Sequence, residues 1–336
     1  MVENKGNLKG FDAVNWNVPD NSYVLTFWEQ NIKQFWVDTE FVPSNDLDSW
    51  KSLSEPMKKA YKRALGGLTL LDTLQSNTGM PQIMQYVESK QNQAVLAYMC
   101  MMEAIHAKSY STIFTTVAST DEISEVFKWV SDNKYLQFKA NKIDKYYQGV
   151  KKGDNMSLYL ALTASVMLES FLFYSGFFLP LWLAGQGKMV ASSDIIKKII
   201  ADESIHGLFI GLIAQDLRKS FSEVEQLQVE AFTESLLEEL YQNELKYTEQ
   251  VYSEIGLTPD VKMYLKYNAN KALMNLGYDA KYQDVVVDPI VLNGLNTDTT
   301  QHDFFSKKST NYEKPLEVVH LKSEDFNLSD SDLKVL

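Results

Sequence analysis

Hydrophobic residues recur every three or four positions through most of the chain, which is the spacing of one face of an α-helix rather than of a strand. Long windows keep this helical spacing, so the pattern predicts an all-α fold. The expected helices cover about 20–35, 55–80, 83–117, 121–148, 155–185, 189–219, 222–254 and 259–276.

Several of these expected helices are longer than is usual in a globular protein, and some are apolar almost all round. Such helices suit the centre of a bundle, where other helices cover them. The most apolar stretch, 171–184, contains Gly176 and Pro180 and is shorter than the roughly 20 residues that a membrane span needs. We therefore expect a buried core helix there and no association with a membrane.

The hydrophobic pattern changes beyond about residue 280. Residues 297–336 are rich in Asp, Ser, Thr, Asn and Lys with scattered aromatic residues, a composition that buries little apolar surface. We expect one helical domain over 1–290 and a flexible C-terminal tail over 291–336.

Charge and cysteine content narrow the possible partners and compartment. The chain has 44 acidic against 32 basic side chains and a formal net charge of -12, which disfavours nucleic acid as a partner. The N-terminal residues lack the apolar segment of a signal peptide, and a single cysteine, Cys100, excludes an internal disulfide. We expect a cytoplasmic protein.

Three of the four histidines follow a glutamate by three positions. On a helix, residues three apart share a face, so the carboxylate and the imidazole can reach one metal ion. One pair lies in the polar segment after Pro315, where a buried helix is not expected, and we treat it as a coincidence. The two pairs in apolar helical settings are Glu103 with His106 and Glu203 with His206, and the pair in the polar segment is Glu317 with His320.

Two further acids, Asp72 and Glu169, are each the lone charge in a long apolar run. One buried acid is more often a hydrogen-bonded core group than a ligand, but several unneutralised carboxylates would severely destabilise a core. Two lone acids and two Glu-x-x-His pairs on four helices are the ligand set of ferritin-like di-iron and di-manganese proteins, although one acid here is Asp. We therefore predict a ferritin-like bundle with a two-metal site, whose oxygen-rich ligands suit iron or manganese.

The chain resembles the small subunit of class I ribonucleotide reductases, most closely class Ib, over roughly 20–312. Four motifs carry the resemblance: L-T-L-L-D-T-L-Q at 68–75, M-E-A-I-H-A-K-S-Y-S at 102–111, A-S-V-M-L-E-S-F-L-F-Y-S-G-F at 164–177 and D-E-S-I-H-G at 202–207. The resemblance implies two manganese or two iron ions with bridging carboxylates, and it favours manganese in the cell. The implied ligands are Asp72, Glu103 and His106 for one ion, and Glu169, Glu203 and His206 for the other.

Tyr110 follows His106 by four residues and Glu103 by seven, so it shares their helix face. An isolated tyrosine there would be interpreted as a core residue with a satisfied hydroxyl. The resemblance instead identifies Tyr110 as the residue that carries a stable radical. It also implies an apolar pocket for the radical, formed by Phe173, Phe177 and Ile199.

Removal of a ribose hydroxyl by the family's chemistry needs a thiyl radical and a dithiol, which one cysteine cannot supply. The substrate site must then lie on another chain, which the resemblance identifies as the large catalytic subunit. The implied route to it begins at Trp36, hydrogen-bonded to Asp202 and through it to His106, and reaches the partner through Tyr312. A homodimer and a flavodoxin-like activase are also implied.

The chain departs from the family pattern at two places. Ala201 stands where the family usually has Arg, which puts an ion pair beside the metal ligands in doubt. The acidic-aromatic peptide S-E-D-F at 323–326 is followed by ten more residues, so we expect docking to the large subunit to use a shifted or altered peptide.

The function that we predict is the radical-generating small subunit of ribonucleoside-diphosphate reductase. One alternative is a two-metal oxidase that acts on its own small ligand, and it would need neither Trp36 and Asp202 nor Tyr312. The other alternative is a ferritin-like metal store, for which a buried tyrosine and an aromatic tail are superfluous.

Overall fold

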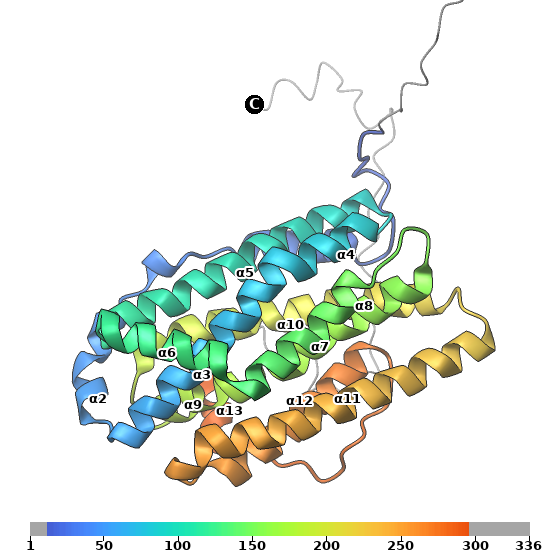
Figure 1. Cartoon of the computed structure of the whole chain (residues 1–336). Helices are drawn as coiled ribbons and strands as arrows, with labels where there is room; N and C mark the ends of the chain where they lie inside the picture. Colours follow the sequence, from blue (N-terminus) through green and yellow to red (C-terminus); the bar gives the residue numbers. More distant parts are fainter. Residues whose placement is uncertain (1–11, 296–336) are drawn as a thin grey trace, which may run out of the picture. The chain divides into compact units, whose positions relative to one another are not determined.

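The computed structural model describes residues 12–295, and all the regular elements in that range are helical (Figure 1). This confirms the predicted all-α fold. The α-helices are α1 (Val24–Gln34), α2 (Leu47–Ser52), α3 (Glu55–Leu74), α4 (Met80–Tyr86), α5 (Lys90–Val117), α6 (Thr120–Asp132), α7 (Lys134–Gln148), α8 (Asn155–Met167), α9 (Tyr174–Ala184), α10 (Val190–Arg218), α11 (Glu223–Tyr252), α12 (Thr258–Asn275) and α13 (Pro289–Leu295). Shorter 3-10 turns are η1 (Asp38–Glu40), η2 (Pro43–Asp46) and η5 (Ser253–Ile255), and π-helical turns are η3 (Gln75–Gly79) and η4 (Leu168–Leu172).

Four helical stretches form the centre of the fold: α3, α5, the run from α8 to α9, and α10. α3 contacts α5 and α9, and α10 contacts α5 and α8, so the four stretches close into a bundle. Other helices cover this centre, because α6 and α7 contact α3 while α11 contacts α7, α8 and α12. Figure 1 shows α5 at the upper side of this bundle and the covering helix α11 below it.

The run from α8 to α9, Asn155–Ala184, is long and apolar enough to cross a membrane by length and composition, with a mean hydropathy of 1.6 in its most apolar window. Inside the fold, however, 83% of that window is buried. A membrane-spanning helix would face lipid, whereas a core helix is covered by other helices. The structure therefore agrees with the predicted buried core helix.

The predicted single helix over 121–148 is wrong, because the chain breaks at Asn133. The Asn133 side chain accepts hydrogen bonds from the backbone N–H groups of Tyr135 and Leu136, both at 3.0 Å. These bonds cap a new helix, α7, and replace the backbone bonds that a continuous helix would make. α6 begins with a capping box in which Ser119 and Glu122 satisfy each other's backbone N–H groups.

The predicted break between 80 and 83 is also displaced. α3 continues through the π-turn η3 into α4, and Pro81 is tolerated because it lies at the start of α4. The chain leaves the helix after Tyr86, and Ser89 caps α5 by accepting from the N–H of Asn92 at 3.0 Å. The second π-turn, η4, lies within the predicted helix 155–185 and was not predicted.

Two short helices, α2 and α13, were not predicted either. α13 packs on α9, and a Cβ at Gly185 would overlap the backbone of Ile290, so a glycine is needed for this approach. The predicted domain boundary at 290/291 falls inside α13. The described residues belong to one compact unit, and the predicted tail, with Tyr312 and the pair Glu317 and His320, lies outside them.

Candidate metal centre

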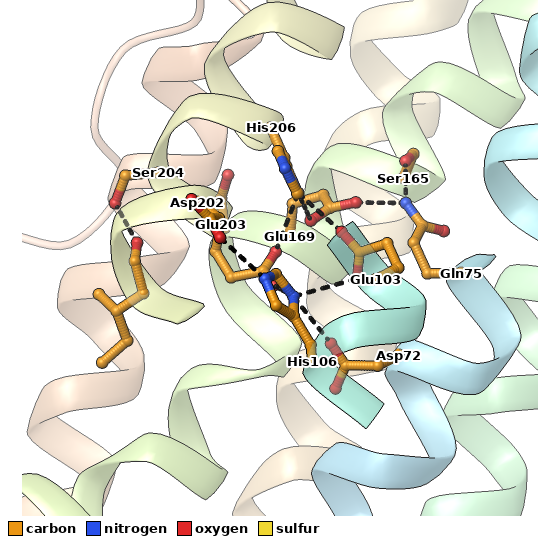
Figure 2. A network of polar contacts seen from close by, with 12 residues as sticks. Asp72, Gln75, Glu103, His106, Ser165, Glu169, Asp202, Glu203, Ser204 and His206 are labelled. Atoms are coloured by element: carbon orange, nitrogen blue, oxygen red, sulfur yellow. Dashed lines mark hydrogen bonds and ion pairs between the residues drawn. The ribbon is translucent and has the colours of Figure 1, made fainter. Parts of the chain in front are cut away.

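The six predicted ligands converge in the middle of the central bundle (Figure 2). All six side chains are fully buried. Their ligand atoms form two groups, and within each group all atoms lie within 4.8 Å of one another. Glu103 and Glu203 belong to both groups, so each is placed to bridge two ions. The first group is Asp72, Glu103, His106 and Glu203, and the second is Glu103, Glu169, Glu203 and His206.

Each of the four central stretches supplies part of this cluster. Asp72 comes from the last turns of α3, and Glu169 comes from the π-turn η4. α5 and α10 each supply one Glu-x-x-His pair. The pairs face each other, since His206 Nδ1 lies 2.7 Å from Glu103 Oε1 and His106 Nδ1 lies 3.0 Å from Glu203 Oε1.

The cluster leaves many polar atoms unsatisfied, which is costly in a protein interior. Four ionised carboxylates carry a charge that two divalent cations would neutralise, and the donor set of oxygens with one imidazole per ion suits manganese or iron. The residues therefore fit a two-metal group. Among the described residues, these atoms of the six side chains have no hydrogen-bond partner: both oxygens of Asp72 and of Glu203, Oε2 of Glu103 and of Glu169, Nδ1 of His106 and Nε2 of His206.

Burial and repulsion between the acids raise the pKa of some carboxyl groups, whereas the neighbouring imidazoles lower the pKa of another. Burial raises the pKa of Asp72 to about 8, and burial together with the charges of Glu103 and Glu169 raises the pKa of Glu203 well above its ordinary value. Although burial opposes it, the neighbouring imidazoles of His106 and His206, the second of which is hydrogen-bonded to Glu103, lower the pKa of Glu103 to about 2. Without cations the centre therefore holds protons at neutral pH.

The histidines share this behaviour. Burial lowers the pKa of His206, but the hydrogen bond to Glu103 and the nearby acid Glu169 outweigh it and raise the pKa to about 9. For His106, burial likewise lowers the pKa, but the hydrogen bond to Asp202 and the nearby acids, Asp72 among them, outweigh it and raise the pKa well above 6.5. Metal ligands must be deprotonated, so ion binding has to displace these protons.

The stability of the metal-free protein should consequently fall as pH rises from 6.5 to 8. A raised native pKa contributes stability below the unfolded pKa, and this stability is lost as pH rises through the native value, about 8 for Asp72 and about 9 for His206. We expect a loss of about 1.4 kcal/mol per pH unit for each such proton. Urea unfolding with a chelator present measures it. With Mn²⁺ present, stability should instead rise with pH, because metal binding strengthens as pH rises. A metal-free protein whose stability rises between about pH 6.5 and 8 would contradict the raised pKa values of these groups.

A chain of hydrogen bonds leads from the cluster to Trp36. Asp202 Oδ2 accepts from Trp36 Nε1 at 2.7 Å and lies 3.0 Å from His106 Nε2. The Trp36 ring lies nearly parallel to the His106 ring, with centroids 5.8 Å apart and an angle of 16°. Both side chains are almost completely buried. An acid on the far nitrogen of a ligating imidazole fixes the ring and its tautomer.

Ala201 replaces the arginine that the family usually has before Asp202. The sequence did not show which side chain contacts Asp202 instead. The other oxygen, Asp202 Oδ1, accepts from Gln34 Nε2 at 3.2 Å, and Gln30 in turn donates to Gln34. A neutral amide thus contacts Asp202. The signal in the sequence is weak, since Gln30 and Gln34 are merely polar residues four apart on α1.

Tyr110 lies one turn after His106 on α5 and is fully buried. Its hydroxyl has no hydrogen-bond partner within residues 12–295. Burial, and then the charges of Asp72, Glu203 and Glu103, raise the pKa of Tyr110 well above its ordinary value. The phenol therefore stays protonated beside the cluster.

The three side chains predicted to enclose Tyr110 are fully buried as well. Phe173 lies between η4 and α9, and it packs against Phe177 on α9, with ring centroids 5.9 Å apart. Ile199 lies on α10, four residues before Glu203. Their contact with Tyr110 stays a prediction.

Gln75 is a second residue that the sequence reasoning missed. It is fully buried and donates hydrogen bonds to Glu169 and to Ser165 (Figure 2). It lies three residues after Asp72 in the motif L-T-L-L-D-T-L-Q. Its position on the same helix face as Asp72 could have identified it as a residue of the cluster.

Comparison with known proteins identifies the family. Residues 13–289 match the family model described as ribonucleotide reductase, small chain. A ribonucleoside-diphosphate reductase subunit beta from Bacillus phage SPbeta is 50% identical over 319 residues, which are 95% of this chain and 97% of that protein. A protein of the same name from Bacillus subtilis is 50% identical over 323 residues, covering 96% of this chain and 98% of the relative.

The fold has a counterpart among solved structures. The X-ray crystal structure of dimanganese(II)-NrdF from Streptococcus sanguinis matches with a TM-score of 0.81 and 44% sequence identity, covering 85% of this chain and 100% of that chain. This match agrees with the ferritin-like bundle predicted from the ligand pattern. The chain therefore belongs to the ribonucleotide reductase small-chain family.

Proposed function

We propose that this chain is the radical-generating small subunit of a ribonucleoside-diphosphate reductase. The observation that carries the proposal is the buried cluster of four carboxylates and two imidazoles next to a buried, unpartnered phenol, Tyr110. Membership of the family supports the same conclusion.

We infer that the centre holds two manganese or two iron ions. Glu103 and Glu203 would bridge the ions, because each belongs to both ligand groups. Asp72 with His106 would complete one site, and Glu169 with His206 the other. When bound and oxidised by oxygen or by the oxidant of an activase, the ion pair would supply the oxidising power for the loss of one electron and the phenolic proton from Tyr110. The dimanganese relative supports manganese, and the ligand set accepts iron equally.

The surrounding side chains would protect and export the radical. Tyr110 is fully buried, so water and reductants are excluded, and Asp72 is the nearby carboxylate that can accept a hydrogen bond from the phenol. Trp36, stacked on His106 and bonded to Asp202, would begin the route out of the centre. Tyr312, outside the described residues, would continue that route to the large subunit.

The family association implies a homodimer and a complex with the large catalytic subunit. We further propose that a flavodoxin-like activase supplies the oxidant when manganese is bound, and that the protein works in the cytoplasm. The two alternative functions, a ligand-binding oxidase and a metal store, do not require the buried hydrogen bonds that connect Trp36 through Asp202 to His106.

Reconstitution tests the proposed function. Protein loaded with iron and exposed to oxygen, or loaded with manganese together with an activase, should give a tyrosyl signal in electron paramagnetic resonance. Only the loaded chain mixed with a large subunit should then convert ribonucleoside diphosphates to deoxyribonucleoside diphosphates, and the metal-free chain in the same mixture is the control. Protein that holds neither metal, or a loaded chain that gives no radical with either metal, would refute the proposal.

A further inference from the structure

The two π-turns of the central bundle meet at one buried polar contact. Gln75 is the first residue of η3, and Glu169 is the second residue of η4. A π-turn inserts one extra residue into a helix and changes the direction of the side chains at that point, and such turns are frequent at functional sites. Here both turns bring a polar side chain to the metal centre, and both side chains are fully buried.

The hydrogen bonds of Gln75 allow only one orientation of its amide. An ionised carboxylate only accepts hydrogen bonds, so the amide nitrogen has to face Glu169. Gln75 Nε2 donates one N–H to Glu169 Oε1 and the other to Ser165 Oγ at 2.8 Å. The amide oxygen then points away from the centre, where Tyr147 donates its hydroxyl to Gln75 Oε1 at 2.6 Å.

Tyr147 is anchored in a space that a glycine leaves open. A Cβ at Gly79 would lie 2.7 Å from Cε2 of Tyr147 and would also overlap the Gln75 amide oxygen. Any side chain there would push the phenol and the amide apart. Tyr147 is itself fully buried, and burial raises its pKa well above the ordinary value, so its hydroxyl remains a donor.

These bonds fix which oxygen of Glu169 faces the cluster. Oε1 accepts from Gln75, whereas Oε2 has no hydrogen-bond partner in the described part of the chain and lies 3.7 Å from His206 Nδ1. Rotation of the carboxylate that turned both oxygens to the ions would break the bond to Gln75. The cost of that rotation is high in a buried site, where an amide N–H left without a partner is expensive.

We propose that Gln75, held by Tyr147 and Ser165, is a positioning residue that turns Glu169 so that Oε2 is the oxygen that faces the ions. The inference rests on the proposed function, because it assigns Glu169 to one of the two ions. The orientation of Glu169 would act at the second ion site and leave the site that contains Asp72 untouched.

Titration of the full-length metal-free protein with Mn²⁺ tests this role of Gln75. Gln75→Leu removes the donor to Glu169, and Tyr147→Phe removes only the hydroxyl that orients Gln75. Tyr159→Phe is the matched control, since Tyr159 is also a fully buried phenol with one hydroxyl contact, 2.9 Å to the hydroxyl of Tyr278. Electron paramagnetic resonance gives both the affinity of each Mn²⁺ and the spectrum of the coupled pair, without any turnover.

Gln75→Leu should weaken binding of the second Mn²⁺ by about 10–100-fold, as is usual when a partner of a metal ligand is lost, and should change the spectrum of the pair. Tyr147→Phe should change both in the same direction to a smaller extent, and Tyr159→Phe should change neither.

Wild-type affinity and spectrum in Gln75→Leu would overturn the inference. If Gln75→Leu does not fold, Tyr147→Phe decides alone, and an unchanged spectrum in that variant overturns it. A wild-type protein that binds no Mn²⁺ would instead refute the proposed function, so the two failures are distinguishable.

Discussion

Tyr110→Phe is expected to abolish the tyrosyl radical signal of the loaded protein and to reduce deoxyribonucleotide formation with the large subunit to background. The substitution removes one hydroxyl that has no hydrogen-bond partner in residues 12–295, so no hydrogen bond is lost. The metal content and the unfolding temperature of the metal-free protein should therefore stay at or above the wild-type values. Electron paramagnetic resonance, metal analysis and thermal unfolding measure the three quantities.

The chain offers a close control for this substitution. Tyr61 is also fully buried, and its hydroxyl also has no hydrogen-bond partner in the described structure. Tyr61→Phe makes the same chemical change on α3, and it should keep the radical. A radical that persists in Tyr110→Phe, or that disappears equally in Tyr61→Phe, would contradict the assignment of Tyr110.

Glu203→Gln should eliminate tight binding of the metal pair while it leaves the metal-free fold intact. Glu203 belongs to both ligand groups, and a neutral amide is a poor bridge between two cations. Because the pKa of Glu203 is raised well above its ordinary value, the metal-free protein already holds this side chain protonated, and Gln resembles that state. The unfolding temperature without metal should thus be unchanged or higher.

Binding at a metal concentration 100-fold above the dissociation constant stabilises a fold by about 2.7 kcal/mol, and Glu203→Gln should lose this gain. Thermal unfolding with and without Mn²⁺, together with metal analysis, measures the loss. Glu317→Gln is the control, because it alters the third Glu-x-x-His pair, which we interpret as a coincidence of spacing. Two retained ions in Glu203→Gln would show that the cluster is not the metal site.

The six side chains of the buried cluster could be predicted from the sequence, because a charge inside an apolar helix is costly and therefore rare. Asp72 and Glu169 stand out as lone charges, and the two Glu-x-x-His pairs identify which faces of their helices meet. The structure brings all six together. The bundle was predictable for the same reason, since helices without a polar face can lie only in the middle of other helices.

Residues that act on the ligands were harder to predict. Gln34 and Gln75 are neutral, and neutral polar residues are common on helices without any special role. Their partners lie far away along the chain, 168 residues for Gln34 and Asp202 and 94 residues for Gln75 and Glu169. The π-turns have no local sequence signature that we recognised, and the break at Asn133 depends on one side chain that competes with the helix backbone.

One oxygen of Asp202 accepts from two rings, because both Trp36 Nε1 and His106 Nε2 are bonded to Oδ2. A cation on the opposite nitrogen of the imidazole draws electron density through that ring and makes its far N–H a stronger donor. The shared oxygen then has less electron density to offer the indole. Metal binding and the proposed route through Trp36 would thereby be linked through a single atom, Asp202 Oδ2. In a metal-free subunit bound to the large subunit, the hydrogen bond to Trp36 would differ in strength from that in a metal-loaded subunit.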